Sequence, residues 1–138
     1  MITAIDTNVL LDILAPNATF YDASARSIED SAHAGSLVIC DLVYAELCIH
    51  FTRQHECDEF LKSIEIRVEP LQPESHFLAT RVWRAYRKQG GQRVRILADF
   101  LIGAHGQVQA TRLLSRDRGF YGSLFPSLKL IDPAQSGS

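Results

Sequence analysis

Four acidic residues have sequence surroundings that suit chemistry at a carboxylate. Asp6 comes directly after the short apolar run 2–5, and Asp117 repeats this order after the apolar segment ATRLLS. Glu46 and Asp99 lie among apolar neighbours in segments with helical spacing. A carboxylate among apolar residues loses hydration, so it requires a helix N-terminus, a cation, or both. The four residues are therefore candidate ligands of a cation.

Asp6 taken alone has a simpler, structural interpretation. Thr7 and Asn8 follow it, and apolar residues then recur at helical spacing. An Asp at such a junction caps the helix by accepting hydrogen bonds from the first backbone N–H groups, which stabilises by about 1 kcal/mol. Asn or Ser would serve equally well as a cap, so a functional role for Asp6 depends on other acids at the same place.

Short β-branched runs alternate with amphipathic helical segments along the chain, which predicts an α/β fold with a central parallel sheet of about five strands. The predicted strands are 2–5, 37–40, 66–71, 110–115 and 128–131. One predicted helix directly follows Asp6, and another ends near residue 64. The other predicted helices span 21–35, 42–51, 74–89 and 96–106.

This architecture brings the acids together. The carboxyl ends of parallel strands share one edge of a sheet, where Asp6 and Asp117 would end strands and the helices of Glu46 and Asp99 would begin nearby. Two carboxylates about 4 Å apart repel by roughly 4 kcal/mol at an effective dielectric constant near 20. A divalent cation removes that cost, and an all-oxygen ligand set indicates Mg²⁺ or Mn²⁺ rather than zinc.

Length and composition indicate one globular domain over residues 1–132, followed by a flexible tail over 133–138. The 138 residues are 46% hydrophobic, and 14 basic residues nearly balance 16 acidic ones. No overall field therefore attracts nucleic acid, and a polyanion site would have to be local. No apolar run reaches the roughly 18 residues of a membrane span, so we expect a cytoplasmic protein without membrane association.

Three cysteines without a CxxC pair argue against a disulfide framework and suit a reducing compartment. We interpret Cys40, Cys48 and Cys57 as small apolar side chains that fill space in the core. His50 and His55 lie between the last two, so four potential zinc ligands occur close together. Residues two apart on a helix face different ways, which disfavours this zinc site.

Basic residues are concentrated between positions 81 and 95. The helix 74–89 is expected to place its apolar side chains inward and its arginines on a solvated outer face. The inward residues are Phe77, Leu78, Val82, Ala85 and Tyr86. The following loop, GGQRVR, carries Arg93 and Arg95 next to two glycines. Two arginines on such a loop favour a phosphate clamp.

Four segments in order, IDTNVLLDIL, AEL, ILADFLIGAH and LLSRDRGFY, resemble the PIN-domain ribonucleases, specifically the VapC-type toxins of toxin–antitoxin pairs. The resemblance extends from Met1 to about Asp132, although residues 51–92 carry no matching motif. It implies a three-layer α/β/α fold, an Mg²⁺-dependent endoribonuclease activity, an RNA substrate, a cognate antitoxin partner and a homodimer.

By this resemblance, each motif position has an implied role. The acidic metal-site positions are Asp6, Glu46, Asp99 and Asp117, and the polar supporting positions are Thr7, Asn8 and Ser115. The implied reaction is metal-assisted hydrolysis of a phosphodiester bond. Residues expected to hold the RNA backbone are Arg95, Arg93 and Arg116.

Other functions fit the sequence less well. A haloacid-dehalogenase-type phosphatase requires a second acid two residues after the first, where this chain has Asn8. A response-regulator receiver requires an Asp at the end of its third strand, where Glu69 and Pro70 stand. The alternative that stays open is a catalytically inactive PIN-like binding module, whose acids only cap helices and which acts through association with a partner.

Overall fold

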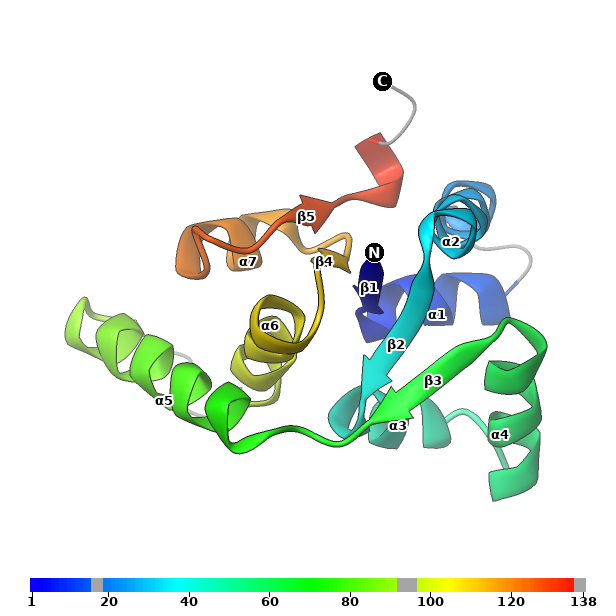
Figure 1. The fold of residues 1–138 in the computed structure, drawn as a ribbon, viewed down its shortest axis with the longest axis horizontal. Coiled ribbons are helices and arrows are strands. Elements are labelled where there is room, and N and C mark those ends of the chain that lie inside the picture. The colour runs from blue at the N-terminus through cyan, green and yellow to red at the C-terminus, as the bar shows by residue number, and fades with distance from the viewer. Residues whose placement is uncertain (16–18, 92–96, 136–138) are drawn as a thin grey trace.

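The computed structural model describes residues 1–15, 19–91 and 97–135. Five strands form one sheet in the order β3-β2-β1-β4-β5, and all four pairings are parallel (Figure 1). The strands are β1 (Ile2–Ile5), β2 (Ser36–Cys40), β3 (Ile66–Glu69), β4 (Arg112–Leu114) and β5 (Leu130–Ile131). The predicted five-stranded parallel sheet is confirmed, with strand ends that differ by one or two residues.

Helices connect successive strands in the described part of the chain. They are α1 (Thr7–Leu14), α2 (Tyr21–Ala34), α3 (Asp41–Cys48), α4 (Gln54–Ser63), α5 (Pro73–Lys88), α6 (Leu97–Gln109), α7 (Arg118–Leu124) and the 3-10 helix η1 (Pro133–Gln135). In Figure 1, α5, α6 and α7 lie to the left of the strands, and α1, α2 and α4 lie to the right. This is the three-layer α/β/α arrangement that the sequence predicts, with α7 as an addition. Residues 133–135, expected to be part of a flexible tail, form η1, in which Pro133 is buried, and residues 136–138 lie outside the described part of the chain.

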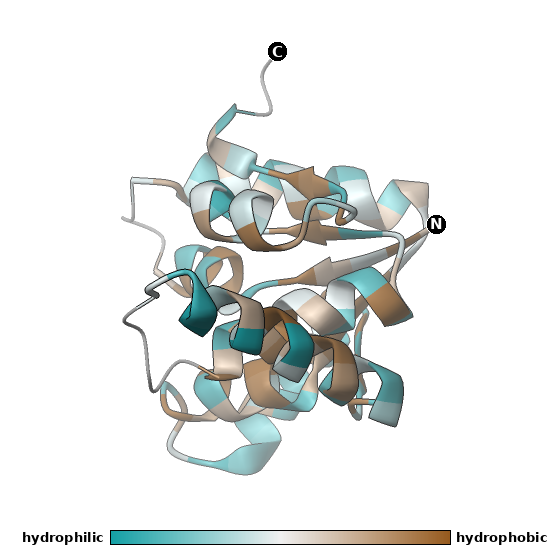
Figure 2. Cartoon of the chain, turned by 90° about the vertical axis from the view of Figure 1, so that its left-hand side faces the viewer, coloured by the Kyte–Doolittle hydropathy of each residue, from teal (hydrophilic) through white to brown (hydrophobic). Residues whose placement is uncertain are grey.

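The central strands are apolar because helices cover both faces of the sheet. Figure 2 shows the hydrophobic residues concentrated on the strands and on the inner faces of the helices. The buried side chains of the three central strands include Ile5, Val38, Ile39, Leu113 and Leu114. Among the described residues, no helix combines the length and apolar character that a membrane span requires.

Helix α5 packs against the core through Leu78, Val82 and Tyr86 as predicted, but Phe77 and Ala85 are exposed. Phe77, expected to face inward, is 65% exposed, whereas Ser75 and Ala79 are fully buried. Small side chains allow α5 to lie close to α6, and the Ser75 hydroxyl donates to Oε1 of Gln109 on α6 at 2.7 Å. The inward assignment of Phe77 was therefore wrong, because close helix packing selected small residues over large apolar ones.

The parallel register brings the carboxyl ends of β1 and β4 together. Ile5 is the register partner of Leu114, and the backbone N–H of Asp6 donates to the Leu114 carbonyl at 2.9 Å. The residues that follow these strands, Asp6 and Ser115, therefore lie side by side at the carboxyl edge of the sheet.

Helix α6 carries Asp99, and its placement depends on a close contact at Gly103. A Cβ atom at Gly103 would lie 2.5 Å from the Phe125 ring, whereas one at Gly119 on α7 would meet nothing within 4 Å. We expect Gly103→Ala to lower the free energy of unfolding by about 1–3 kcal/mol through overpacking. The matched control, Gly119→Ala, should leave it unchanged or raise it by up to about 1 kcal/mol. Urea unfolding of both variants checks this, and equal stabilities would contradict it.

Candidate metal centre

Asp6 lies at the centre of a hydrogen-bond network at the carboxyl edge. Its backbone is the N-cap of α1, and its Oδ1 accepts from the backbone N–H of Thr7 at 2.8 Å. Its Oδ2 accepts from the Ser115 hydroxyl at 2.8 Å and from the Asn8 amide at 3.2 Å. Asp6 therefore caps α1, as its place in the sequence predicts, and it also makes hydrogen bonds that a cap does not require. Only 6% of the residue is exposed, so the carboxylate is held by protein groups and not by solvent.

The burial of Asp6 has an electrostatic cost. Loss of hydration raises the pKa of this carboxyl, while the hydrogen bonds from Ser115, Thr7 and Tyr121 act in the opposite direction. The negative charge of Glu46 raises the pKa further. A positive group at this place would favour the ionised form, because opposite charges stabilise each other.

Thr7 connects Asp6 with Glu46, the second predicted acid. The Thr7 hydroxyl donates to Oε1 of Glu46 at 2.5 Å, and its backbone N–H donates to Asp6. Glu46 is half-buried on α3, which begins where β2 ends. One threonine at the start of α1 therefore orients two carboxylates from different elements.

Ser115 and Asn8 connect the end of β4 with the same network. The Ser115 oxygen accepts from the backbone N–H of Asp117 at 3.0 Å while its hydroxyl donates to Asp6. The Asn8 oxygen accepts from the backbone N–H of Arg116 at 3.2 Å. These bonds fix the turn that carries Asp117.

Tyr121 is the common neighbour of three acids, and it is a residue that the sequence analysis did not identify. It is 1% exposed on α7 and makes a hydrogen bond to Asp6. Burial, followed by the charge of Asp6, raises the pKa of its hydroxyl, and the charges of Asp99 and Asp117 add to this. Its position after an acid in the motif SRDRGFY was the available signal, but helix α7 had to be recognised first.

The chemistry of this group of side chains fits a hydrated Mg²⁺ or Mn²⁺ ion. Within the described ranges, no three His, Cys, Asp or Glu side chains lie close enough to share one ion directly. Mg²⁺ commonly retains several waters and binds through only one or two carboxylates. The oxygen-only set and the raised pKa of Asp6 match that mode, whereas zinc sites characteristically include His or Cys ligands. The ligand role of each acid stays a prediction.

Arg116, predicted to hold RNA, is paired with Asp12 of the same chain, and 27% of its side chain is exposed. Its guanidinium donates to both carboxylate oxygens of Asp12, at 2.8 and 3.0 Å, and lies 4.2 Å from the centre of the Phe20 ring. The Ser24 hydroxyl also donates to Asp12. This geometry assigns Arg116 a structural role and gives no support to RNA contact. Arg93 and Arg95, the other predicted RNA contacts, lie outside the described residues.

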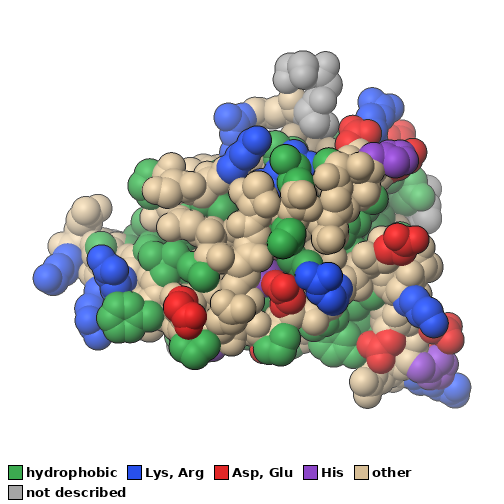
Figure 3. Space-filling model, in the orientation of Figure 1, with side chains coloured by type: hydrophobic (Ala, Val, Ile, Leu, Met, Phe, Trp, Pro, Cys, Tyr) green, Lys and Arg blue, Asp and Glu red, His purple; other side chains and the backbone are tan. Residues whose placement is uncertain are grey.

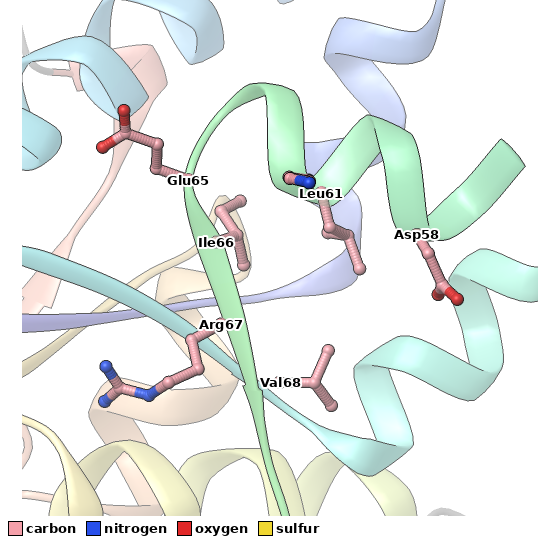
Figure 4. Close-up of a pocket in the computed structure, with 7 residues that line it drawn as sticks. Asp58, Leu61, Glu65, Ile66, Arg67 and Val68 are labelled. Carbon is pink, nitrogen blue, oxygen red and sulfur yellow. The ribbon is translucent and has the colours of Figure 1, made fainter. Parts of the chain in front are cut away.

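Two surface hollows differ in their relation to the acids. One, of about 490 Å³, is lined by Asp117, Tyr86 and Phe120 among others and so adjoins the acidic edge. Another, of about 460 Å³ between α4 and β3, contains none of the predicted site residues (Figure 4). Only the first continues the candidate metal centre to the surface.

Basic side chains gather near the first hollow, on the last two turns of α5. They are visible on the left of Figure 3, at the position of α5 in Figure 1. The exposed cations of this helix are Arg81, Arg84, Arg87 and Lys88. Their exposure agrees with the solvated helix face that the sequence predicts.

Solved structures contain chains with this fold, among them one in a toxin–antitoxin complex from Klebsiella pneumoniae, with a TM-score of 0.68 and 15% identity over 95% of this chain and 97% of that one. A chain in the structure of VapBC2 from Rickettsia felis, bound to a DNA fragment from their promoter, is similar with a TM-score of 0.75 and 18% identity over 96% of this chain and 98% of that one. A chain in the structure of VapBC-1 from nontypeable Haemophilus influenzae has a TM-score of 0.72 and 16% identity, over 98% of this chain and 100% of that one. A chain in the structure of FitAcB from Neisseria gonorrhoeae has a TM-score of 0.64 and 20% identity, over 98% of this chain and 99% of that one.

The family follows from the sequence match. Residues 3–122 match the PIN domain, so the chain belongs to the PIN-domain family. No curated protein sequence matches the chain. The resemblance drawn from the four motifs is thereby confirmed at the level of the family and its fold.

Replacing Asp6 by Asn tests the cost of its burial. A raised folded-state pKa means that the parent protein loses stability as the pH rises above about 3.8 and through that pKa. The neutral amide lacks this loss, so Asp6→Asn should gain stability relative to the parent between pH 4 and pH 7. Urea unfolding with a chelator present measures the difference. Asp30→Asn, on the exposed end of α2, controls for removal of one charge, and a pH-independent difference for Asp6→Asn would contradict the expectation.

Proposed function

We propose that this PIN domain is a metal-dependent endoribonuclease, the toxin component of a toxin–antitoxin pair, acting in the cytoplasm. The observation that carries the proposal is the buried Asp6 carboxylate. A second acid, Glu46 of the segment AEL, lies near it, and Ser115 and Tyr121 of the segment LLSRDRGFY donate hydrogen bonds to it. PIN domains are typically nucleases, and this chain retains every polar position that the resemblance assigns to catalysis.

A bound Mg²⁺ or Mn²⁺ ion would lower the pKa of a coordinated water and stabilise negative charge on the phosphate oxygens. Asp6 and Asp99 are proposed as direct ligands, with Glu46 and Asp117 completing the site directly or through water. The hydrogen bonds to Asp6 keep its carboxylate in one orientation, which limits the rearrangement needed when charge develops.

The supporting residues have separable tasks. Thr7 holds Glu46 in place, and Ser115 holds both Asp6 and the backbone of Asp117. Asn8 donates to Asp6 and accepts from the backbone of Arg116, so it fixes the turn before Asp117. We propose that these three residues position the acids and the waters between them.

An inactive binding module remains the second candidate. It would need the acids only as helix caps, and Asp6 does cap α1. Asp117 is the N-cap residue of α7, and Asp99 lies in the first turn of α6, where a helix N-terminus favours an acid. Glu46, in contrast, lies in the second half of α3, whose N-cap residue is Cys40. Capping therefore does not account for the full acidic set, which favours the nuclease.

Cleavage of total RNA tests the activity. We expect the protein to cut RNA in the presence of Mg²⁺ or Mn²⁺ and to stop when the metal is chelated. Asp6→Asn and Asp99→Asn should fold and lose cleavage, and Ser115→Ala should reduce it by about 10–100-fold, as is typical for groups that orient metal ligands. The exposed control Asp30→Asn should cleave at the parent rate. Unchanged cleavage by folded Asp6→Asn protein would refute its role.

The proposed antitoxin gives a second test. Structural neighbours are toxin–antitoxin complexes, and we propose that a small protein encoded next to this chain covers the acidic edge, with an arginine directed at the carboxylates. Co-expression should yield a complex in which RNA cleavage is suppressed and restored when the partner is removed. Full cleavage by the purified complex would count against inhibition at this site. The homodimer implied by the resemblance stays a prediction that light scattering measures directly.

A further inference from the structure

Two of the three cysteines meet where helices α3 and α4 pack together, below the sheet in Figure 1. Cys48 is the last residue of α3, and Cys57 lies in the first turns of α4. Their thiols are hydrogen-bonded to each other. Both also line the same hollow of about 380 Å³. The pair is thus a contact between side chains from two helices and not a coincidence of sequence spacing.

Neighbouring polar groups hold the two helices in this arrangement. The Tyr44 hydroxyl on α3 donates to Oδ1 of Asp58 on α4 at 2.6 Å. Tyr44 also makes a hydrogen bond with Cys48, one helical turn further along α3. The residues Tyr44, Cys48, Cys57 and Asp58 therefore form one connected cluster across the α3–α4 contact. A cross-link between the two sulfur atoms would join elements that already lie together.

The two thiols differ in access to solvent. Cys57 is fully buried, and loss of hydration raises the pKa of its thiol to about 11, with a contribution from Cys48. Cys48 is partly exposed and borders the hollow together with Thr52 and Arg53. An oxidant from solution therefore reaches Cys48 first. Cys40 is buried at the end of β2 and does not line this hollow.

We propose that Cys48 and Cys57 are a redox modification site that forms a reversible intramolecular disulfide with a low-molecular-weight disulfide as oxidant. The Cys48 thiolate attacks the small disulfide, which releases one small thiol and leaves a mixed disulfide on Cys48. The Cys57 thiol then loses its proton and attacks the Cys48 sulfur, which releases the second small thiol. Two protein thiols are oxidised and one small disulfide is reduced to two thiols, so the exchange balances.

The structure confirms the predicted packing role of the cysteines, because Cys40 and Cys57 lie in the hydrophobic core and Cys48 packs against it. The histidines at 50 and 55 are exposed, and no three potential metal ligands approach one another in the described ranges, so the geometry does not support zinc. Cys48 and Cys57 are also more than apolar filling, because their thiols touch. Disulfides of proteins in reducing compartments are commonly transient and redox-sensing, which suits a partly accessible pair. The proposal is independent of the nuclease proposal, although Glu46 lies two residues before Cys48 on the cross-linked helix.

Thiol mapping of the full chain tests the proposal. The folded, reduced protein is incubated with excess oxidised glutathione and acidified, and its remaining thiols are alkylated in denaturant so that buried cysteines react. The product is examined by mass spectrometry, intact and after proteolysis. We expect one alkylated cysteine per chain, at Cys40, and a peptide cross-link between Cys48 and Cys57 that disappears on treatment with reduced glutathione. Three alkylated cysteines, a lasting glutathione adduct on Cys48, or a cross-link to Cys40 would each overturn the proposal.

Variants of each cysteine provide matched controls. Cys40→Ala should form the cross-link as the parent does, whereas Cys48→Ser and Cys57→Ser should not. Circular dichroism establishes that each variant is folded, and Cys48→Ser, at the partly exposed position, keeps the test decisive if Cys57→Ser does not fold. Oxidation of the parent in concentrated urea should give all three possible pairings. The same mixture from the folded protein would show that the structure does not select this pair.

Discussion

The buried carboxylate of Asp6 is the constraint on which the rest of the site depends. Its two oxygens accept from Thr7, Asn8 and Ser115, so the end of β1, the start of α1 and the end of β4 are bound to one group. A buried carboxylate is tolerated only when its hydrogen-bonding capacity is met. Meeting that need fixes the turn after β4, and with it Asp117, relative to the first strand.

In the parallel sheet, short loops are enough to bring the residues of this network together. Crossover helices return the chain to the same end of the molecule each time, so residues more than a hundred positions apart become neighbours at the carboxyl edge. Ile5 and Leu114 are register partners, and their successors carry the site. The separate Asp12–Arg116 pair acts on the same turn, since Arg116 lies between Ser115 and Asp117. The turn is thus held at both its backbone and its side chains.

The presence of about five parallel strands and the position of Asp6 after the first of them were predictable because they depend on local patterns: apolar runs, polar stops and helical spacing. The contacts that depend on three-dimensional packing were not. Tyr121 has no signature of its own before α7 is known, and the pairing of Asp12 with Arg116 joins two segments that no periodicity connects. Phe77 shows the same limit, because hydrophobicity predicted burial where close helix packing required the small Ser75 and Ala79.

The cost of burying Asp6 also separates the two candidate functions. A helix cap requires a hydrogen-bond acceptor, which a neutral Asn or Ser supplies without a buried charge. The ionised Asp6 carboxylate is instead destabilised by loss of hydration and by the neighbouring Glu46 charge, and both raise its pKa. Functional sites are where proteins retain such locally destabilising groups. A binding module has no use for the charge itself, whereas a centre that binds a divalent cation uses that charge to attract its ion.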